Sequence, residues 1–174
     1  FKAPFEASVE VAHQLRGLAD WMVASQNIAR TPIWEHEEVL DRLKRQPSAP
    51  AHELGLAIRD SFERTTRNED RTLSVVDVRA MEGVVAGVDA LARKMIEHLG
   101  TDRDAFAQIR AKLRGMLDQS GQGGYSFASY VDLIDLLQRL EGATSPDIAS
   151  AAGELRAKLQ GAILANVHGS LVPH

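Results

Sequence analysis

Few residues of this 174-residue chain have the chemistry that catalysis needs. The chain contains no cysteine, so its own residues provide no disulfide, no thiolate metal ligand and no thiol nucleophile. His168 stands next to Gly169 and Ser170, but a general base must lie within hydrogen-bond reach of its nucleophile, and sequence neighbours rarely form such a dyad. We therefore interpret His168 as a surface histidine in a turn.

The remaining histidines and the acidic residues lack the spacing of a metal site. Structural zinc sites place their ligands a few residues apart, and these histidines are widely separated. Four acidic residues fall in the first turns of a predicted helix, where carboxylates complement the helix dipole and face solvent. We expect no metal and no cofactor. The residues are His13, His36, His52, His98 and His174, with Glu35, Glu37, Glu38 and Asp41.

The glycine-rich segment 119–124 is not followed by the Lys-Ser or Lys-Thr pair of a phosphate-binding loop, so we interpret it as a connector between helices. The net charge of −4 and the absence of a basic run give no indication of a nucleic acid or membrane-surface partner. No apolar run approaches the roughly 20 residues of a membrane span. The hydrophobic fraction of 44% is enough for one domain with a core.

The apolar periodicity predicts a helix-rich chain with two or three short strands. In the helix over 35–45 we expect Val39, Leu40 and Leu43 to face inward, and we expect the apolar stripe of 81–99 to be buried. Thr101 and Asp104 resemble a capping box. The predicted helices cover 8–19, 35–45, 54–67, 81–99, 101–117, 125–140 and 146–163, and the predicted strands cover 21–24, 72–78 and 164–167.

So few strands make a poor sheet by themselves. We therefore expect unpaired sheet edges, with the other strands of any larger sheet lying outside this sequence. The sequence does not begin with methionine and its start is not a signal peptide, so we expect a processed chain or a fragment.

Four segments in order resemble one known family. Residues 7–25 read ASVEVAHQLRGLADWMVAS, which is similar to the stretch after the catalytic cysteine in the clostripain family, F-D-A-C-L-M-A-S-V-E-V-A-Y-Q-L-R-D-V-A-D-Y-M-V-A-S. Residues 72–77 resemble its T-L-S-A-I-D strand, and residues 130–133 resemble its Y-V-D-L helix start. Residues 166–169 resemble the segment before its G-L-S-I-Y-F-P strand.

The resemblance implies an α/β fold with a caspase-like sheet flanked by helices, of which this chain is a helix-rich segment with few strands. We expect one clostripain-like segment over 1–174, with residues 1–80 continuing the α/β core and residues 81–174 mainly helical.

The resemblance also places three residues at the positions of the catalytic machinery. Pro4 stands at the cysteine position, and proline has no nucleophile. Lys2 and Pro32 stand at the two acid positions of the pocket that holds a basic substrate side chain. The family's histidine segment lies upstream of Phe1.

These departures favour a degenerate pseudo-peptidase that acts by binding or assembly with a protein or peptide, including another chain or segment of the same peptidase-like protein. One alternative is a segment of an active clostripain-like cysteine endopeptidase that cleaves after basic residues and whose nucleophile lies outside this chain. The other is a helical interaction module. We expect a soluble bacterial protein, with the cytoplasm favoured over secretion.

Overall fold

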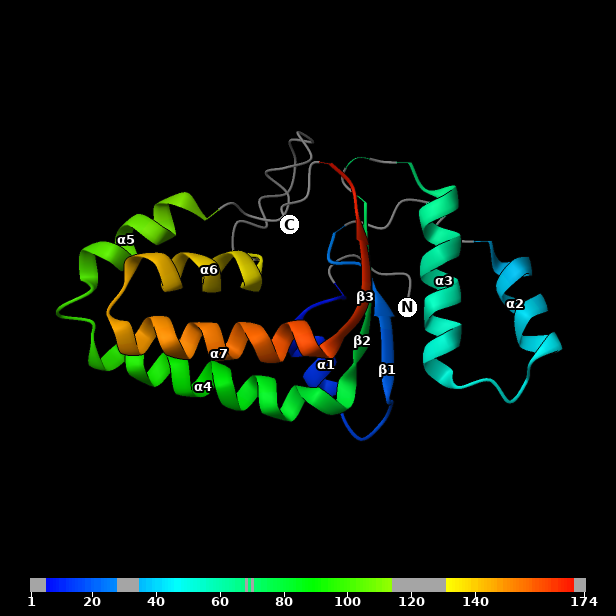
Figure 1. The fold of residues 1–174 in the computed structure, drawn as a ribbon, viewed down its shortest axis with the longest axis horizontal. Coiled ribbons are helices and arrows are strands. Elements are labelled where there is room, and N and C mark those ends of the chain that lie inside the picture. Colours follow the sequence, from blue (N-terminus) through cyan, green and yellow to red (C-terminus); the bar gives the residue numbers. More distant parts are fainter. Residues whose placement is uncertain (1–5, 28–34, 68, 70, 114–130, 171–174) are drawn as a thin grey trace. The chain divides into compact units, whose positions relative to one another are not determined.

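The computed structural model describes residues 6–27, 35–67, 69, 71–113 and 131–170 (Figure 1). These residues divide into two compact units. The first extends to Met81 and includes the chain from Ala162 onward, and the second covers Glu82–Gly161. The elements are α1 (Val9–Gln14), β1 (Trp21–Ala24), α2 (His36–Arg45), α3 (Ala51–Thr65), β2 (Thr72–Asp77), η1 (Val78–Ala80), α4 (Met81–Glu97), α5 (Arg103–Lys112), α6 (Leu133–Ala143), α7 (Pro146–Ala162) and β3 (Ile163–His168).

The first unit is built on a three-stranded antiparallel sheet of order β1-β2-β3. Val23 lies opposite Val75, and Leu73 lies opposite Val167. Val75 pairs with Ala165 but Val76 pairs with Ile163, so β3 has a bulge at this point. Within the described residues no further strand pairs with the outer edges of β1 and β3, which agrees with the expectation of an open sheet.

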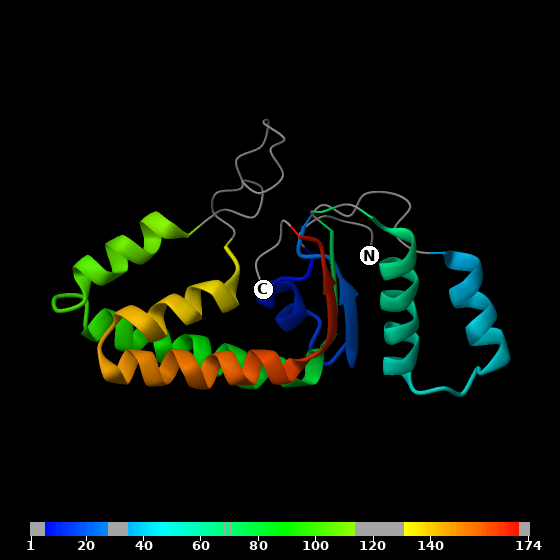
Figure 2. The same ribbon diagram turned by 45° about the horizontal axis from the view of Figure 1, so that its top comes forward.

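Helices lie on both sides of this sheet, with α3 on one side and α1 on the other (Figures 1 and 2). Alternate strand residues face opposite sides, so Val23, Leu73 and Val75 share the face that contacts α3. Leu73 packs there with Phe62 and Val167, which are nearly inaccessible to solvent. Burial on both faces explains why β2 is a nearly continuous apolar run.

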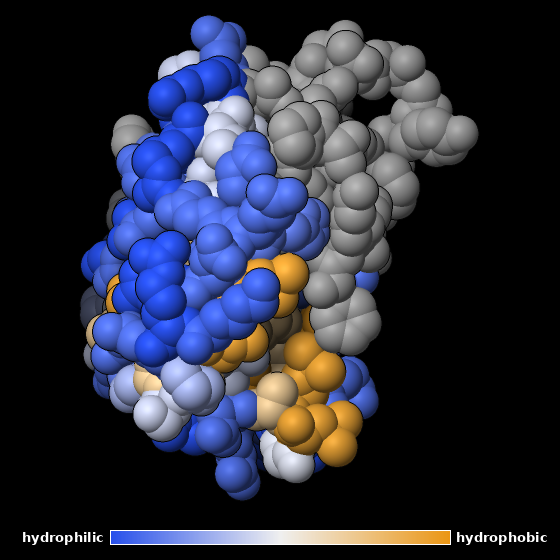
Figure 3. Space-filling model, turned by 90° about the vertical axis from the view of Figure 1, so that its right-hand side faces the viewer, coloured by the Kyte–Doolittle hydropathy of each residue, from blue (hydrophilic) through white to orange (hydrophobic). Residues whose placement is uncertain are grey.

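Helix α2 packs on α3 but buries none of its own residues. The prediction that Leu40 and Leu43 face inward is therefore wrong: their exposed fractions are 55% and 42%, and Val39 is only half-buried. The reason is that α2 lies outside α3 and contacts no strand of the sheet closely (Figures 1 and 2). Viewed from this side, most of the described surface is hydrophilic, with hydrophobic residues gathered toward one end (Figure 3).

The second unit contains α4, α5, α6 and α7, whose apolar stripes form its core. The buried residues include Val84, Leu91, Ile109, Leu137, Leu140, Ile148, Ala152, Leu155 and Leu159. At Gly87 of α4 a Cβ atom would lie 2.9 Å from Cδ1 of Leu155 in α7, so these two helices approach closely at this glycine.

The predicted stripe of 81–99 is only partly correct. Val85 and Val88 are half-buried, whereas Ile96 and Leu99 are 71% and 58% exposed. Ile96 lies well around the helix from Val84 at 100° per residue, and Leu99 follows the end of α4 at Glu97.

Local hydrogen bonds decide where several helices begin. Ser8 caps α1 as expected, accepting from the Val11 amide at 3.2 Å, but α1 ends at Gln14 and Leu18 is exposed. The predicted capping box is wrong, because Thr101 Oγ1 donates to the His98 carbonyl and α5 begins after Asp102.

Helix α6 begins at Leu133 rather than in the segment from residue 125, because the Asp132 carboxylate accepts from the Asp135 amide at 2.9 Å. The start of α7 at Pro146, directly after Ser145, is confirmed, and β3 is a strand as predicted. Among the described helices, none is both long and apolar enough to span a bilayer.

Candidate functional site

A buried polar network lies at the end of the sheet where β1 finishes and β2 begins. The hydroxyl groups of Ser25 and Thr72 lie 2.9 Å apart, and both residues are at least 94% inaccessible to solvent. Thr72 Oγ1 also accepts from the backbone amides of Gln26 and Asn27, at 2.9 and 3.0 Å. Ser25 Oγ donates to the Asn27 carbonyl at 2.9 Å. Thr72 therefore fixes the path of the chain as it leaves β1.

The same end of the sheet holds the two segments in which the resemblance places the catalytic positions. The Ala7 amide donates to the Ser25 carbonyl at 3.0 Å, which ties the chain just after Pro4 to the network. The Glu35 amide donates to Ser61 Oγ of α3 at 3.0 Å, which fixes the chain just after Pro32. Lys2, Pro4 and Pro32 themselves lie outside the described residues.

His168 also belongs to this end of the sheet. It lies directly opposite Thr72 as the last residue of β3, and it is half-buried. The expectation of a surface histidine in a turn is therefore wrong. A hydrogen bond of 3.2 Å joins Nδ1 to the Gly169 carbonyl, which can only accept, so Nδ1 carries the hydrogen. The Gly169 amide donates to the Arg71 carbonyl at 2.8 Å and extends the strand pairing.

A second group of side chains lies at the opposite end of β1 and β2. The Arg79 guanidinium lies 5.2 Å from the ring centroid of Trp21, whose other neighbour is the His52 ring at 5.5 Å. Arg79 donates to both carboxylate oxygens of Asp77, at 2.8 and 2.7 Å. This hydrogen bonding holds the pKa of Asp77 below its ordinary value. The group fixes the turn from β2 into η1, far along the strands from Thr72.

The other residues considered for chemistry remain dispersed. In the described part of the chain, no three His, Cys, Asp or Glu side chains are grouped closely enough to hold a metal ion. The acidic residues of α2 are exposed, and Glu38 and Asp41 form ion pairs with basic side chains. The glycine-rich segment and His174 lie outside the described residues. His98 is the histidine that the structure does group with carboxylates.

Sequence reasoning missed the Ser25–Thr72 network. Both residues were expected only as parts of a strand and an irregular segment, and 47 positions separate them. A threonine at the first position of a buried strand is the one signal that indicated a polar role there. Chemically, the network can hold two loops in place, and a binding pocket formed by those loops would depend on it.

The chain resembles solved structures over nearly its whole length. An inactive zymogen of a C11 protease from Parabacteroides distasonis aligns with 97% of this chain and 43% of its own, at 18% identity and a TM-score of 0.67. A clostripain from Bacteroides thetaiotaomicron in complex with a peptide inhibitor aligns with 96% of this chain and 65% of its own, at 16% identity and a TM-score of 0.55. A cysteine protease of B. fragilis gives 96%, 65%, 14% and 0.56 for the same quantities.

At these identities the likeness establishes the fold, which is α/β and helix-rich, with a small sheet. The chain spans less than two thirds of each of these three proteins. A comparison with curated proteins found no match. The model of the clostripain family matches residues 1–167 of the 174. The four segments that resemble that family fall inside this match or reach its end, and the chain therefore belongs to the clostripain family.

Proposed function

We propose that this chain is part of a clostripain-like pseudo-peptidase, which keeps the fold of the family and acts by binding another protein segment. The observation that carries the proposal is the complete lack of cysteine in a chain matched by the family over residues 1–167. A cysteine peptidase needs a thiolate for its covalent step. Fold alone does not supply that chemistry.

The residues at the pocket positions support the same proposal. By resemblance, Pro4 takes the place of the nucleophile, and Lys2 and Pro32 take the places of two acids. A pocket for an arginine or lysine side chain needs converging carboxylates, and Lys2 has the opposite charge. The network around Ser25 and Thr72 still ties down the chain beside these positions. What is kept is a framework for binding without the groups for cleavage.

The open sheet favours a partner that belongs to the same peptidase-like protein. Strands β1 and β3 are the two edges of a sheet of only three strands, and unpaired edges recruit further strands. The exposed Leu40 and Leu43 of α2 add an apolar surface in the same unit. A bacterial, cytoplasmic location and the absence of nucleic acid and membrane partners belong to this proposal.

A second candidate is a segment of an active cysteine endopeptidase that cleaves after basic residues. The observation that favours it is length, because the chain covers only 43% of the C11 zymogen and 65% of the Bacteroides thetaiotaomicron clostripain. A nucleophile contributed from outside these residues would then perform the reaction.

The test is turnover of fluorogenic arginyl and lysyl peptides by the purified protein that contains this segment in its natural sequence. We expect no turnover and no labelling by thiol-directed peptide inhibitors. Treatment with a thiol-alkylating reagent is the control. Turnover that alkylation abolishes would reject the pseudo-peptidase and establish the second candidate.

Two variants separate loss of the nucleophile from loss of the pocket. Pro4→Cys restores a thiol but leaves Lys2 facing the substrate cation, so we expect no cleavage after basic residues. Lys2→Asp combined with Pro4→Cys also restores one acid. Cleavage by Pro4→Cys alone would show that the proposed pocket assignment of Lys2 is wrong.

A further inference from the structure

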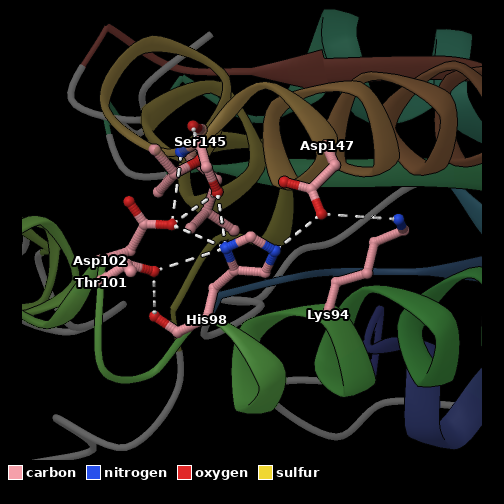
Figure 4. Close-up of polar contacts among 8 residues, drawn as sticks. Lys94, His98, Thr101, Asp102, Ser145 and Asp147 are labelled. Atoms are coloured by element: carbon pink, nitrogen blue, oxygen red, sulfur yellow. Dashed lines mark hydrogen bonds and ion pairs between the residues drawn. The ribbon is translucent and has the colours of Figure 1, made fainter.

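A second polar cluster, distinct from the candidate site, lies within the helical unit (Figure 4). His98 follows the end of α4, Asp102 precedes α5, and Ser145 and Asp147 flank the first residue of α7. The His98 Nε2 atom lies 2.8 Å from Oδ2 of Asp147, and its Nδ1 atom lies 3.7 Å from Oδ2 of Asp102. One imidazole ring thus stands between two carboxylates from segments that are far apart in sequence.

The hydroxyl groups beside the ring direct their hydrogens elsewhere. Ser145 Oγ donates to Asp102 at 2.6 Å, and Thr101 Oγ1 donates to the His98 carbonyl at 3.1 Å. Both hydroxyl oxygens nevertheless lie near Nδ1, at 3.3 and 3.5 Å. A neutral ring that donates from Nε2 to Asp147 would leave the Nδ1 lone pair facing oxygen acceptors. A protonated ring donates from both nitrogens and satisfies all of these contacts.

The charges of the cluster favour the same state. The charged groups in contact with the ring or its partners are Asp102, Asp147 and Lys94, whose Nζ atom lies 3.9 Å from Asp147. Burial opposes the ionised form of Asp147, but hydrogen bonding from Ser145, the His98 charge and the backbone amides of the first turn of α7 together hold its pKa below the ordinary value. With both carboxylates ionised, the cluster is electrically neutral only when His98 is protonated.

A nucleophilic role for Ser145 does not fit this geometry. Its hydrogen is directed to Asp102 at 2.6 Å rather than to the ring nitrogen at 3.3 Å. A serine nucleophile must give its proton to the general base that activates it.

We propose that the His98 cluster is a proton-dependent clamp that holds the first turn of α7 against the α4–α5 corner. Protonation of His98 adds an ion-paired donor toward Asp102 and strengthens the pair with Asp147. The clamp is therefore firmest in mildly acidic solution and loosens as the pH rises and the ring loses its proton. The stabilisation disappears again in strong acid, where the carboxylates become protonated.

The experiment is site-resolved amide hydrogen exchange on the complete chain, comparing it with His98→Gln at about pH 5.5 and about pH 8. The reporting amide is that of Ala149, which donates to the Ser145 carbonyl at 2.9 Å in the first turn of α7. We expect the variant to lose protection about tenfold at the acidic pH and only about twofold at the alkaline pH. Comparison at equal pH removes the intrinsic pH dependence of exchange.

His13→Gln is the matched control, because the His13 ring lies 3.2 Å from the Arg16 guanidinium rather than beside a carboxylate. It should leave Ala149 exchange unchanged at both pH values. Asp102→Asn is the second variant, since it keeps the shape and removes the charge beside Nδ1. We expect it to abolish or reverse the pH dependence of the protection. The proposal is overturned if His98→Gln reduces protection equally at both pH values, or if Asp102→Asn leaves the pH dependence intact.

Discussion

The close packing of α3 on the sheet makes Gly55 the position where one added methyl group should do most harm. A Cβ atom at Gly55 would lie 2.9 Å from Cγ1 of Val75 and 3.3 Å from Cγ2 of Val23. Favourable contacts between carbon atoms are about 3.5–4.0 Å, so the methyl overlaps both valines. Valine is stiff at χ1 and Val75 is fully buried, so neither side chain can swing aside easily.

Two opposing effects determine the free energy of unfolding of Gly55→Ala. Replacing glycine by alanine inside a helix stabilises it by about 0.5–1 kcal/mol. Overpacking a core costs about 1–3 kcal/mol. Gly153→Ala isolates the first effect, because its Cβ would lie 3.7 Å from Cδ of Glu141 at the nearest, an ordinary contact. We expect Gly153→Ala to stabilise the protein, and Gly55→Ala to fall about 1–3 kcal/mol below it.

The assay is urea denaturation followed by circular dichroism, with amide exchange to report on each unit separately. A third variant, Val75→Ala, removes the methyl groups that the new Cβ would meet. In that background Gly55→Ala should become neutral or stabilising, which gives a coupling within the same unit. If Gly55→Ala stabilises the unmodified protein as much as Gly153→Ala does, the packing argument fails.

Three further predictions follow from described contacts. Thr72→Val should lower the free energy of unfolding by about 1–3 kcal/mol, because two buried amides lose their acceptor, and Thr72→Ser should recover most of it; equal urea midpoints for the two variants would contradict this. Hydrogen bonds from Arg156 hold the pKa of Glu141 below its ordinary value of 4.5, so Glu141→Gln should be less stable than the wild type at neutral pH and the deficit should vanish as the pH falls below that value; thermal melts between neutral and acidic pH test it, and a deficit that persists in acid would refute it. Gly87→Ala should change the thermal midpoint little, because the new methyl meets only the flexible end of Leu155; a large destabilisation would show that this side chain cannot move.

The fold could be predicted where periodicity and burial agree. Helix α7 has a cap and proline at its start and a buried stripe that includes Leu155, and β2 is a short apolar run bounded by charge. The prediction failed where a segment has only one packing neighbour. Leu40 and Leu43 follow an inward-facing pattern, but α2 lies on α3 alone and leaves them exposed.

The candidate site was predictable only through the family resemblance. Lys2, Pro4 and Pro32 were assigned by it, and their assignment stays a prediction because they lie outside the described residues. The supporting network could not be anticipated, because contacts such as Ser25 with Thr72 depend on strand register rather than on local spacing. The same holds for His98 and Asp147, which meet only after α4 and α7 have packed.

The position of the helical unit in the chain has a consequence for how the protein folds. Strands β2 and β3 are hydrogen-bonded neighbours, yet all of the second unit, Glu82–Gly161, lies between them in sequence. Closing a flexible loop of about 80 residues costs about 4 kcal/mol of chain entropy before any strand contact forms. If α4 and α7 pair first, with Gly87 against Leu155, the two ends of that loop are already together and most of this cost is removed. We expect the helical unit to form early and the pairing of β3 with β2 to be the slow step, so substitutions in α4 and α7 should slow the folding of the sheet itself.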